Sequence, residues 1–366
     1  MTISTKRRTF LTGSLASMAL TVAPLVTHAE GKDKFDWSKT YDVIVVGSGG
    51  AGLSAAVAAA QNKASTVVIE KMDIIGGNTR ITGGAFNAVD PVEQEKEGIK
   101  DSVELHAEQT LKAGDYRGNP ELVKEFTKRA PEALQWLKDC GVVFLPGVYQ
   151  VYGGLHPRAH SSNKPFGLGY IEALENKCKE LNVPILLNTK VVRLIREGNL
   201  TGRVIGVEVL TKRGKTQFLR AVKGIVIASG GFSANPQARA LHDPRLYDLP
   251  TTNHKGATGD LISPAQDIGA EVVGMDYIQL LPGGATTGRF IGMVSPVESV
   301  IFVNKNGDRF VAEDNRRDVI ADAILGSPTK VVFGIRDADG YAAMNKGATK
   351  AFNGAFEIGD AVKADT

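Results

Sequence analysis

The sequence has 366 residues, of which 43% are hydrophobic, and it contains 2 cysteines. This composition excludes a disordered or fibrous protein, and the length excludes a minimal binding module because it allows two or three domains. The formal net charge of +3 comes from 43 Lys and Arg against 40 Asp and Glu. Lys6, Arg7 and Arg8 account for all of it, so the rest of the chain is neutral and indicates no nucleic-acid partner.

Residues 1–29 have the features of an export signal. They contain no Asp or Glu, and their three basic residues precede a mildly apolar run, 10–26, that ends in the small-x-small pattern Thr27-His28-Ala29. Arg7-Arg8-Thr9-Phe10-Leu11 resembles the twin-arginine type of signal, which exports folded proteins. An uncleaved membrane anchor is the alternative, but Thr, Gly and Ser residues dilute the run. We therefore expect a periplasmic protein with no membrane span after cleavage.

A predicted linker, 30–40, leads into a strand and a glycine-rich turn. The strand, 41–46, is rich in β-branched residues and runs directly into Gly47-Ser48-Gly49-Gly50-Ala51-Gly52. An alanine-rich stretch, 53–61, follows and predicts a helix. Gly47, Gly49 and Gly52 match G-x-G-x-x-G, the pattern in which backbone N–H groups at a helix N-terminus hold a pyrophosphate.

A second predicted strand, 66–69, ends in Glu70. An acidic residue at this distance from the glycines can accept hydrogen bonds from the ribose hydroxyls of a dinucleotide. A glycine-rich turn in an unrelated α/β protein is the alternative. The order of strand, turn, helix, strand and acidic residue disfavours it.

Two further glycine-rich turns, 76–79 and 82–87, follow closely and suit a long, extended cofactor. Together with Glu70-Lys71, the segments Gly76-Gly77-Asn78 and Gly83-Gly84-Ala85-Phe86-Asn87 resemble the flavin domain of the fumarate reductase and succinate dehydrogenase flavoprotein family. The likeness is greatest to the soluble, exported flavocytochrome c branch, and it extends from about Tyr41 to Leu325.

This resemblance implies an α/β fold: a Rossmann-like FAD-binding domain with a parallel sheet and an inserted β-meander, 41–278, and part of an α+β capping domain, 279–366. Membrane-bound members attach FAD through a His in the region that corresponds to Asn78–Thr82, where this sequence has none, so we expect non-covalent FAD. The expected cofactor residues are Gly47, Gly49, Gly50, Ala51, Gly52, Glu70, Lys71, Gly77, Asn78, Thr79, Gly83, Gly84, Val192, Ala228, Gly230, Gly231 and Asp260.

The last of these residues belong to the second half of the predicted domain. Segments 184–194, 203–210 and 216–221 predict three meander strands, and 224–228 predicts a strand that returns to the parallel sheet. In the family, the backbone near Val192 meets the adenine and the turn containing Gly230 and Gly231 approaches the cofactor. Thr258-Gly259-Asp260 resembles the family's T-G-D-G turn, although Leu261 replaces the last glycine.

Segments 101–113 and 120–140 predict helices, the second with Asn119 as N-cap and Pro120 at N1. Its apolar residues are expected core contacts: Leu122, Phe126, Ala133, Leu134 and Leu137. Cys140 and Cys178 lie in helix-like segments, so two free buried thiols are favoured over a disulfide. The 6 His form no cluster with Cys, so no metal site is expected.

The resemblance also implies a reaction. Family members reduce an activated C=C bond by hydride transfer from flavin N5 while an Arg delivers a proton, and His and Arg side chains hold the substrate carboxylate. Arg317 corresponds to the proton-donating Arg, and Glu313 is a candidate relay partner. A surface Arg paired with Asp318 or Asp314 is the alternative. Arg158 and His160 correspond to an Arg-x-His near the flavin, and a solvated surface loop is equally compatible with their sequence.

Gln279-Leu280-Leu281-Pro282 matches the family's Q-x-H-P turn, but Leu281 replaces the carboxylate-binding His. An apolar side chain cannot pair a second carboxylate in a closed site. We therefore expect a small unsaturated carboxylate other than fumarate, with an apolar or aromatic group beyond the double bond.

Segments 304–310 and 331–335 predict an Asn-Gly hairpin turn and a further strand of a capping domain, inside which the sequence ends. Three alternatives follow. In the first, the chain is the N-terminal part of a truncated reductase whose electrons come from a separate c-type cytochrome or other donor. In the second, it is a non-catalytic FAD-binding fragment. In the third, it is a flavin dehydrogenase that works in the oxidising direction.

Overall fold

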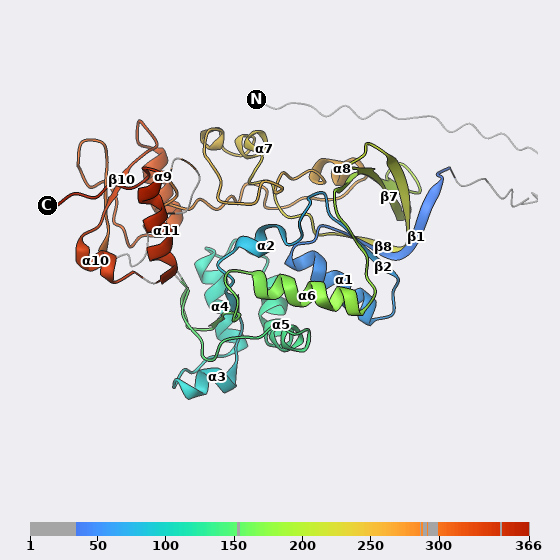
Figure 1. Cartoon of the computed structure of the whole chain (residues 1–366), viewed down its shortest axis with the longest axis horizontal. Coiled ribbons are helices and arrows are strands. Elements are labelled where there is room, and N and C mark those ends of the chain that lie inside the picture. Colours follow the sequence, from blue (N-terminus) through green and yellow to red (C-terminus); the bar gives the residue numbers. More distant parts are fainter. Residues whose placement is uncertain are drawn as a thin grey trace, which may run out of the picture. The chain divides into compact units, whose positions relative to one another are not determined.

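The computed structural model describes residues 34–151, 154–285, 287, 291, 299–344 and 346–365 (Figure 1). The predicted export signal, 1–29, lies outside these residues. The strands are β1 (Trp37–Val46), β2 (Thr66–Ile69), β3 (Phe86–Asn87), β4 (Ala159–His160), β5 (Ile185–Leu186), β6 (Thr189–Arg196), β7 (Val204–Thr211), β8 (Thr216–Ile227), β9 (Ile301–Val303) and β10 (Phe333–Ile335).

The helices alternate with the strands mainly in the first half of the chain. They are α1 (Gly50–Gln61), α2 (Gly77–Ile81), α3 (Pro91–Lys96), α4 (Val103–Ala113), α5 (Pro120–Asp139), α6 (Leu168–Glu180), α7 (Pro236–Ala240), α8 (Ile262–Asp267), α9 (Arg317–Leu325), α10 (Ala338–Ala342) and α11 (Lys346–Glu357), with a 3-10 helix, η1 (Pro244–Leu246), after α7.

The central sheet has the strand order β5-β2-β1-β8-β7-β6. β1 pairs in parallel with β2 and with β8, and β2 pairs in parallel with β5. β8, β7 and β6 form an antiparallel meander at the other side of the sheet. The expected α/β class, a mostly parallel sheet with an inserted meander, is confirmed.

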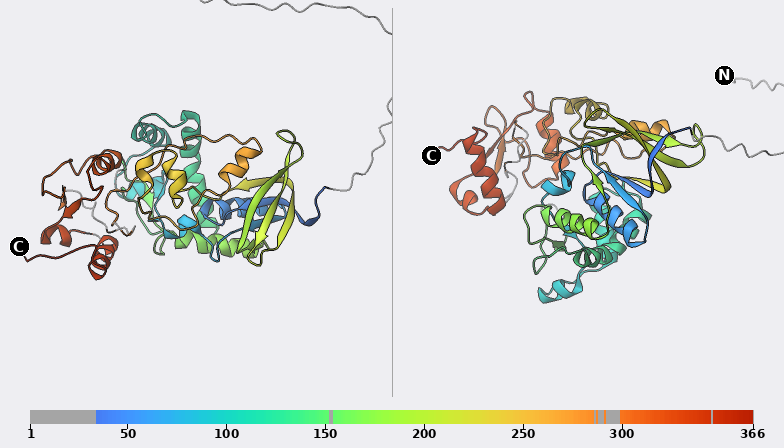
Figure 2. Two further views of the ribbon diagram at one scale, coloured as in Figure 1. Left: turned by 90° about the horizontal axis from the view of Figure 1, so that it is seen from above. Right: turned by 45° about the vertical axis from the view of Figure 1, so that its right-hand side comes forward.

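Helices α1 and α6 cover one face of the sheet, and α8 lies on the other (Figures 1 and 2). On one face, α1 packs beside α6, and their side chains, among them Leu53 and Ile171, form one buried cluster with Val45 and Val68 of the sheet. On the other face, Leu261 and Ala265 of the α8 region pack against the meander. Cys140 and Cys178 are free and buried in the first cluster, as expected.

Two strand predictions were wrong. The expected third meander strand and the expected returning strand are one continuous strand, β8, which pairs with β7 and β1. The expected strand over 184–194 is divided: β5 pairs with β2, and β6 lies at the opposite edge of the sheet. Asn188 between them has a positive φ of 50°, which breaks the extended backbone.

The ends of two predicted segments also differ. β1 begins at Trp37, so the last four residues of the predicted linker belong to the sheet.

α5 has the expected N-cap, Asn119, whose side chain accepts hydrogen bonds from the N–H groups of Glu121 and Leu122. Leu134 and Leu137 are buried, but Leu122 and Phe126 are 69% and 60% exposed, so their expected core role is wrong.

Residues beyond Ser299 have an apolar cluster of their own, in which Val300, Phe302 and Ile320 are buried. β9 pairs with β10, and the turn after β9 is closed by a hydrogen bond from Asn304 N–H to the carbonyl of Asp308 at 3.0 Å. This is the expected hairpin turn. A separate core is what a capping domain requires, although the boundary at residue 279 stays a prediction.

A buried polar cluster connects α4 to β4. Arg158 donates to both oxygens of Asp101, from Nε at 2.9 Å and from an Nη at 2.7 Å. Gln94 also donates to Asp101, at 2.8 Å. His106 is buried beside this pair, and burial together with the positive charge of Arg158 lowers its pKa to about 4.

His106 should make the protein sensitive to mild acid. Its ring is neutral when folded and takes up a proton when unfolded, so stability is complete above pH 6.5 and falls as the pH decreases towards 4. We expect His106→Leu to flatten the dependence of the urea midpoint on pH between 7 and 5. His242→Gln, at an exposed position, is the control. Equal pH slopes for wild type and His106→Leu would contradict this prediction.

Candidate functional site

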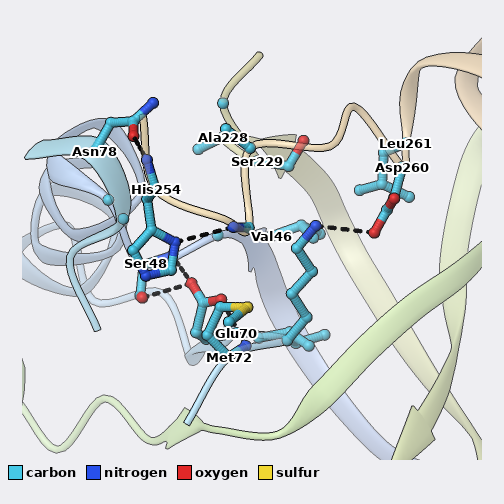
Figure 3. Close-up of a pocket in the computed structure, with 18 of the residues that line it drawn as sticks. Val46, Ser48, Glu70, Met72, Asn78, Ala228, Ser229, His254, Asp260 and Leu261 are labelled. Atoms are coloured by element: carbon cyan, nitrogen blue, oxygen red, sulfur yellow. Dashed lines mark hydrogen bonds and ion pairs between the residues drawn. The ribbon is translucent and has the colours of Figure 1, made fainter. Parts of the chain in front are cut away.

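A pocket opens where β1, β2 and β8 end (Figure 3). Its floor is the turn between β1 and α1, and the loop before α8 forms part of its wall. The lining residues are Val46, Gly47, Ser48, Gly49, Gly50, Ala51, Ile69, Glu70, Lys71, Met72, Gly77, Asn78, Thr79, Thr189, Lys190, Val191, Ala228, Ser229, Gly230, His254, Gly256, Ala257, Asp260 and Leu261.

Two glycines of the β1–α1 turn are required by close backbone approach. A Cβ on Gly52 would lie 1.9 Å from the carbonyl oxygen of Gly47. A Cβ on Gly47 would lie 2.3 Å from the carbonyl oxygen of Ala228, and Gly47 has a φ of +105°. The helix can therefore start directly against the ends of β1 and β8 only without side chains at these positions.

The N-terminus of α1 faces the pocket without a side-chain cap. Its N-cap is Gly49, which has no side chain to accept the first N–H groups of the helix. The N–H of Gly50 donates to Thr79 Oγ1 at 3.0 Å. The backbone N–H groups of the first turn and the positive end of the helix dipole make this end of the pocket a site for an anion.

Glu70 lies at the end of β2, where it is buried. Its Oε2 accepts hydrogen bonds from the N–H and the hydroxyl of Ser48, at 2.9 and 2.6 Å, and its Oε1 accepts from the N–H of Met72 at 2.9 Å. These bonds fix the carboxylate at the pocket wall, where a ribose hydroxyl could reach it.

The other side of the pocket contains an ion-paired cluster. Lys71 Nζ donates to Asp260 Oδ2 at 2.9 Å and to Thr258 Oγ1 at 2.6 Å, and Lys190 Nζ lies 3.1 Å from Asp260 Oδ2. Burial raises the pKa of Asp260, but the hydrogen bonds from Lys71, Thr258 and Lys190 outweigh it and lower that pKa to about 2. Asp260 is therefore ionised at neutral pH.

The backbone at position 261, the last residue of the T-G-D-x turn, can accept a residue with a side chain. Leu261 has a helical backbone, with φ −99° and ψ −1°, and so does not need a glycine there. Its side chain is 3% exposed and packs in the sheet core, while Gly259, two residues earlier, has a φ of +70°. The departure from the family pattern thus gives the pocket an apolar wall.

The pocket fits the diphosphate and ribose of a dinucleotide such as FAD. The uncapped helix N-terminus suits the diphosphate, the glycine turn lets it approach the backbone, and the carboxylate of Glu70 suits a ribose. Among the described residues, no group of His, Cys, Asp and Glu could hold a metal ion.

Most of the expected cofactor residues line this pocket: Gly47, Gly49, Gly50, Ala51, Glu70, Lys71, Gly77, Asn78, Thr79, Ala228, Gly230 and Asp260. Gly52, Gly83, Gly84, Val192 and Gly231 do not. Val192 is 37% exposed, and its neighbour Val191 faces the pocket because side chains alternate along a strand. At Gly84, a Cβ would lie 2.4 Å from the carbonyl oxygen of Phe166, which explains this glycine by packing.

Arg158 and His160 do not line the pocket. Arg158 is held in the buried pair with Asp101, and His160 is 1% exposed, with its Nε2 3.3 Å from the carbonyl oxygen of Ala88. The ring of Phe144 packs edge-on against His160, and burial lowers the pKa of this histidine. The alternative of a solvated surface loop is therefore wrong for both side chains, and their catalytic role stays a prediction.

The expected catalytic residues of the capping segment are not among the residues that line the pocket. Arg317 is the first residue of α9, and Gln279 is exposed in the segment before β9. Glu313 accepts hydrogen bonds from Arg309 at 2.6 Å and from the N–H of Phe302 at 2.9 Å, and its relay to Arg317 stays a prediction. The preceding residue, Arg316, binds Asp318 at 2.6 Å.

Several lining residues were not predicted from the sequence. Ser48 lies inside the glycine pattern at a position that the pattern leaves free, and its role follows from its bonds to Glu70. Lys190 lies two residues before Val192, the valine expected near the adenine. His254 is isolated in a loop with no motif around it, so no sequence signal could have identified it.

Comparisons with known proteins agree with this geometry. The fold and pocket define a dinucleotide-binding α/β flavoprotein domain. A family model described as the FAD binding domain matches residues 42–332. The chain therefore belongs to this FAD-binding family.

Individual proteins and one solved structure are also similar to this chain. The chain is 36% identical to NADH:fumarate oxidoreductase of Klebsiella pneumoniae strain 342, over 85% of this chain and 33% of that protein. It is 33% identical to urocanate reductase of Eggerthella lenta, over 96% of this chain and 62% of that protein. The open conformation of a flavocytochrome c3 fumarate reductase superposes with a TM-score of 0.78 and 30% identity, over 88% and 56% of the two chains. The chain thus spans between a third and about two thirds of these proteins.

Asp260 should act by holding the two lysines. We expect Asp260→Asn to lower the free energy of unfolding at pH 7 by roughly 1–2 kcal/mol and to weaken FAD binding, because Lys71 and Lys190 lose a charged partner. Urea denaturation and flavin fluorescence titration measure the two effects. The depressed pKa makes the stability difference complete above pH 3.8, and it disappears as the pH falls towards 2.

Asp267→Asn is the matched control, because Asp267 is exposed on α8 in the same region of the chain. It should leave stability and FAD affinity unchanged. Equal effects of the two substitutions would show that the ion-paired cluster has no particular role.

Proposed function

We propose that this chain is the FAD-binding part of an oxidoreductase that reduces the C=C bond of a small unsaturated carboxylate. The observation that carries the proposal is the pocket at the N-terminus of α1, in a chain whose relatives are named for fumarate and urocanate reduction. The α1 N-terminus and the glycine turn would hold the diphosphate, and Glu70 the adenosine ribose. When bound, FAD supplies the electron pair for the reduction.

FAD would be held without a covalent bond. Helix α2, Gly77–Ile81, contributes Gly77, Asn78 and Thr79 to the pocket and contains no histidine. The pocket offers backbone hydrogen-bond donors and a carboxylate, the groups by which proteins hold a dinucleotide without a covalent bond.

Non-covalent binding has a direct test. We expect acid precipitation of the purified flavoprotein to release all of its flavin into the supernatant, where chromatography identifies it as FAD. Flavin that stays with the precipitated polypeptide after washing would contradict the proposal.

Arg317 is the proposed proton donor. It is the first residue of α9, in a segment that also contains Glu313, Asp314 and Asp318, and acidic groups near a guanidinium could help to return a proton to it. Glu313 would support this role indirectly, because its bonds to Arg309 and to the backbone N–H of Phe302 hold the segment that leads into α9.

The substrate is proposed to carry one carboxylate rather than two. Leu281 is 36% exposed and stands where related sequences place a carboxylate-binding His. A second carboxylate against this side chain would lack a partner, at a cost of a few kcal/mol. Acrylate-like, urocanate-like or cinnamate-like acids would instead meet an apolar surface.

The substrate panel separates these possibilities. Purified full-length protein, supplied with a reduced low-potential dye, should oxidise the dye with acrylate, urocanate or cinnamate and far more slowly with fumarate. Leu281→His should raise kcat/KM for fumarate at least several-fold, because it restores a donor for the second carboxylate. Leu280→His is the matched control. Efficient fumarate reduction by the unaltered protein would refute the assignment.

The same panel tests the alternatives. FAD binding without activity on any acid would favour a non-catalytic FAD-binding fragment. Oxidation of a saturated substrate with an artificial acceptor, without the reverse reaction, would favour a dehydrogenase.

The proposed electron donor is a separate c-type cytochrome or another donor, and the proposed location is the periplasm, reached through the twin-arginine-type signal. The described part of the chain contains no helix that is long and apolar enough to cross a membrane.

A further inference from the structure

His254 lines the cofactor pocket, and none of the roles assigned above uses it. It lies in the loop that leads to α8. Figure 3 shows its ring on the wall of the pocket opposite Asp260.

The surroundings of the ring fix which nitrogen carries the proton. The backbone N–H of Gly256 donates to Nδ1 of His254 at 3.1 Å. A nitrogen that accepts a hydrogen bond is unprotonated, so the neutral ring carries its proton on Nε2. The loop therefore holds an N–H donor in the pocket rather than an acceptor.

A chain of contacts places His254 at the α1 end of the pocket. Its backbone N–H donates to Oδ1 of Asn78 at 2.7 Å. Thr79, the next residue, accepts the N–H of Gly50, the first residue of α1, at 3.0 Å. His254 thus lies across from the helix N-terminus, where a dinucleotide places its diphosphate.

The charges of the pocket explain why a hydrogen-bond donor is needed there. Lys71 and Lys190 both bind Asp260 on the other side of the pocket, and Glu70 adds a negative charge. These four side chains sum to no net charge. A diphosphate with two negative charges must therefore be stabilised by backbone N–H groups and by other donors nearby.

We infer that His254 is a cofactor-binding residue whose Nε2–H donates a hydrogen bond to the diphosphate of the bound dinucleotide. This inference rests on the proposed FAD binding. Asn78 has a supporting role in it: by accepting the N–H of His254, it holds the loop so that the ring faces the diphosphate.

Two substitutions separate the donor from the loop contact. The amide nitrogen of Gln reaches the place of Nε2, so His254→Gln keeps the donor and loses the acceptor for Gly256. The amide oxygen of Asn reaches the place of Nδ1, so His254→Asn keeps the bond from Gly256 and loses the donor. Calorimetric titration of the full chain with ADP, adenosine and FAD measures both.

We expect His254→Asn to weaken ADP and FAD binding about tenfold or more, the effect of losing a hydrogen bond to a charged group. His254→Gln should stay within about threefold of the wild type, and adenosine should bind all three proteins equally. Equal losses for Asn and Gln, or an equal loss for adenosine, would overturn the inference. If the wild type binds neither FAD nor ADP, the proposed function fails as well.

The tautomer provides an independent readout. In long-range ¹⁵N–¹H spectra of the full chain, with His254 assigned by the loss of its signals in His254→Gln, the proton should be on Nε2. Its signal should shift on addition of ADP but not of adenosine. A proton on Nδ1, or equal shifts with both ligands, would overturn the inference.

Discussion

The structure depends on one close approach of backbone to backbone. Gly52 lies so near the carbonyl of Gly47 that any side chain would collide with it, and Gly47 in turn lies against the carbonyl of Ala228. This contact joins the start of α1 to the ends of β1 and β8. Because parallel strands end at the same edge of a sheet, it also brings Glu70 beside the helix N-terminus. The anion site and the carboxylate follow from that one packing constraint.

The rest of the pocket is assembled from segments far apart in the sequence. The loop before α8 is attached to the first third of the chain by the bonds of Lys71 to Thr258 and Asp260, and by that of Asn78 to the backbone of His254. These bonds join groups more than 170 positions apart. The site therefore forms only when the sheet is complete, which ties cofactor binding to the folding of the whole α/β unit.

The sequence was most informative where structure is determined locally. The strand, the glycine turn, the helix and Glu70 could be predicted because sterics within a few residues impose them. β8 could not be divided correctly, because an apolar pattern shows that a strand exists and not which strands it pairs with. Leu122 and Phe126 have helical spacing, but spacing does not reveal that no described segment covers them. His254 and Arg158 owe their surroundings to remote residues, so their contacts needed the structure.

The continuity of β8 has a consequence for how motion spreads through the protein. One strand pairs with β7 near its start and with β1 along its length, and it ends at the residue before Ala228 in the pocket. Loosening the meander therefore disturbs the hydrogen bonds of the strand that closes the pocket. Backbone amides of the meander and of the pocket floor should exchange with solvent as one cooperative unit, so that a ligand at the diphosphate end also protects the distant meander strands.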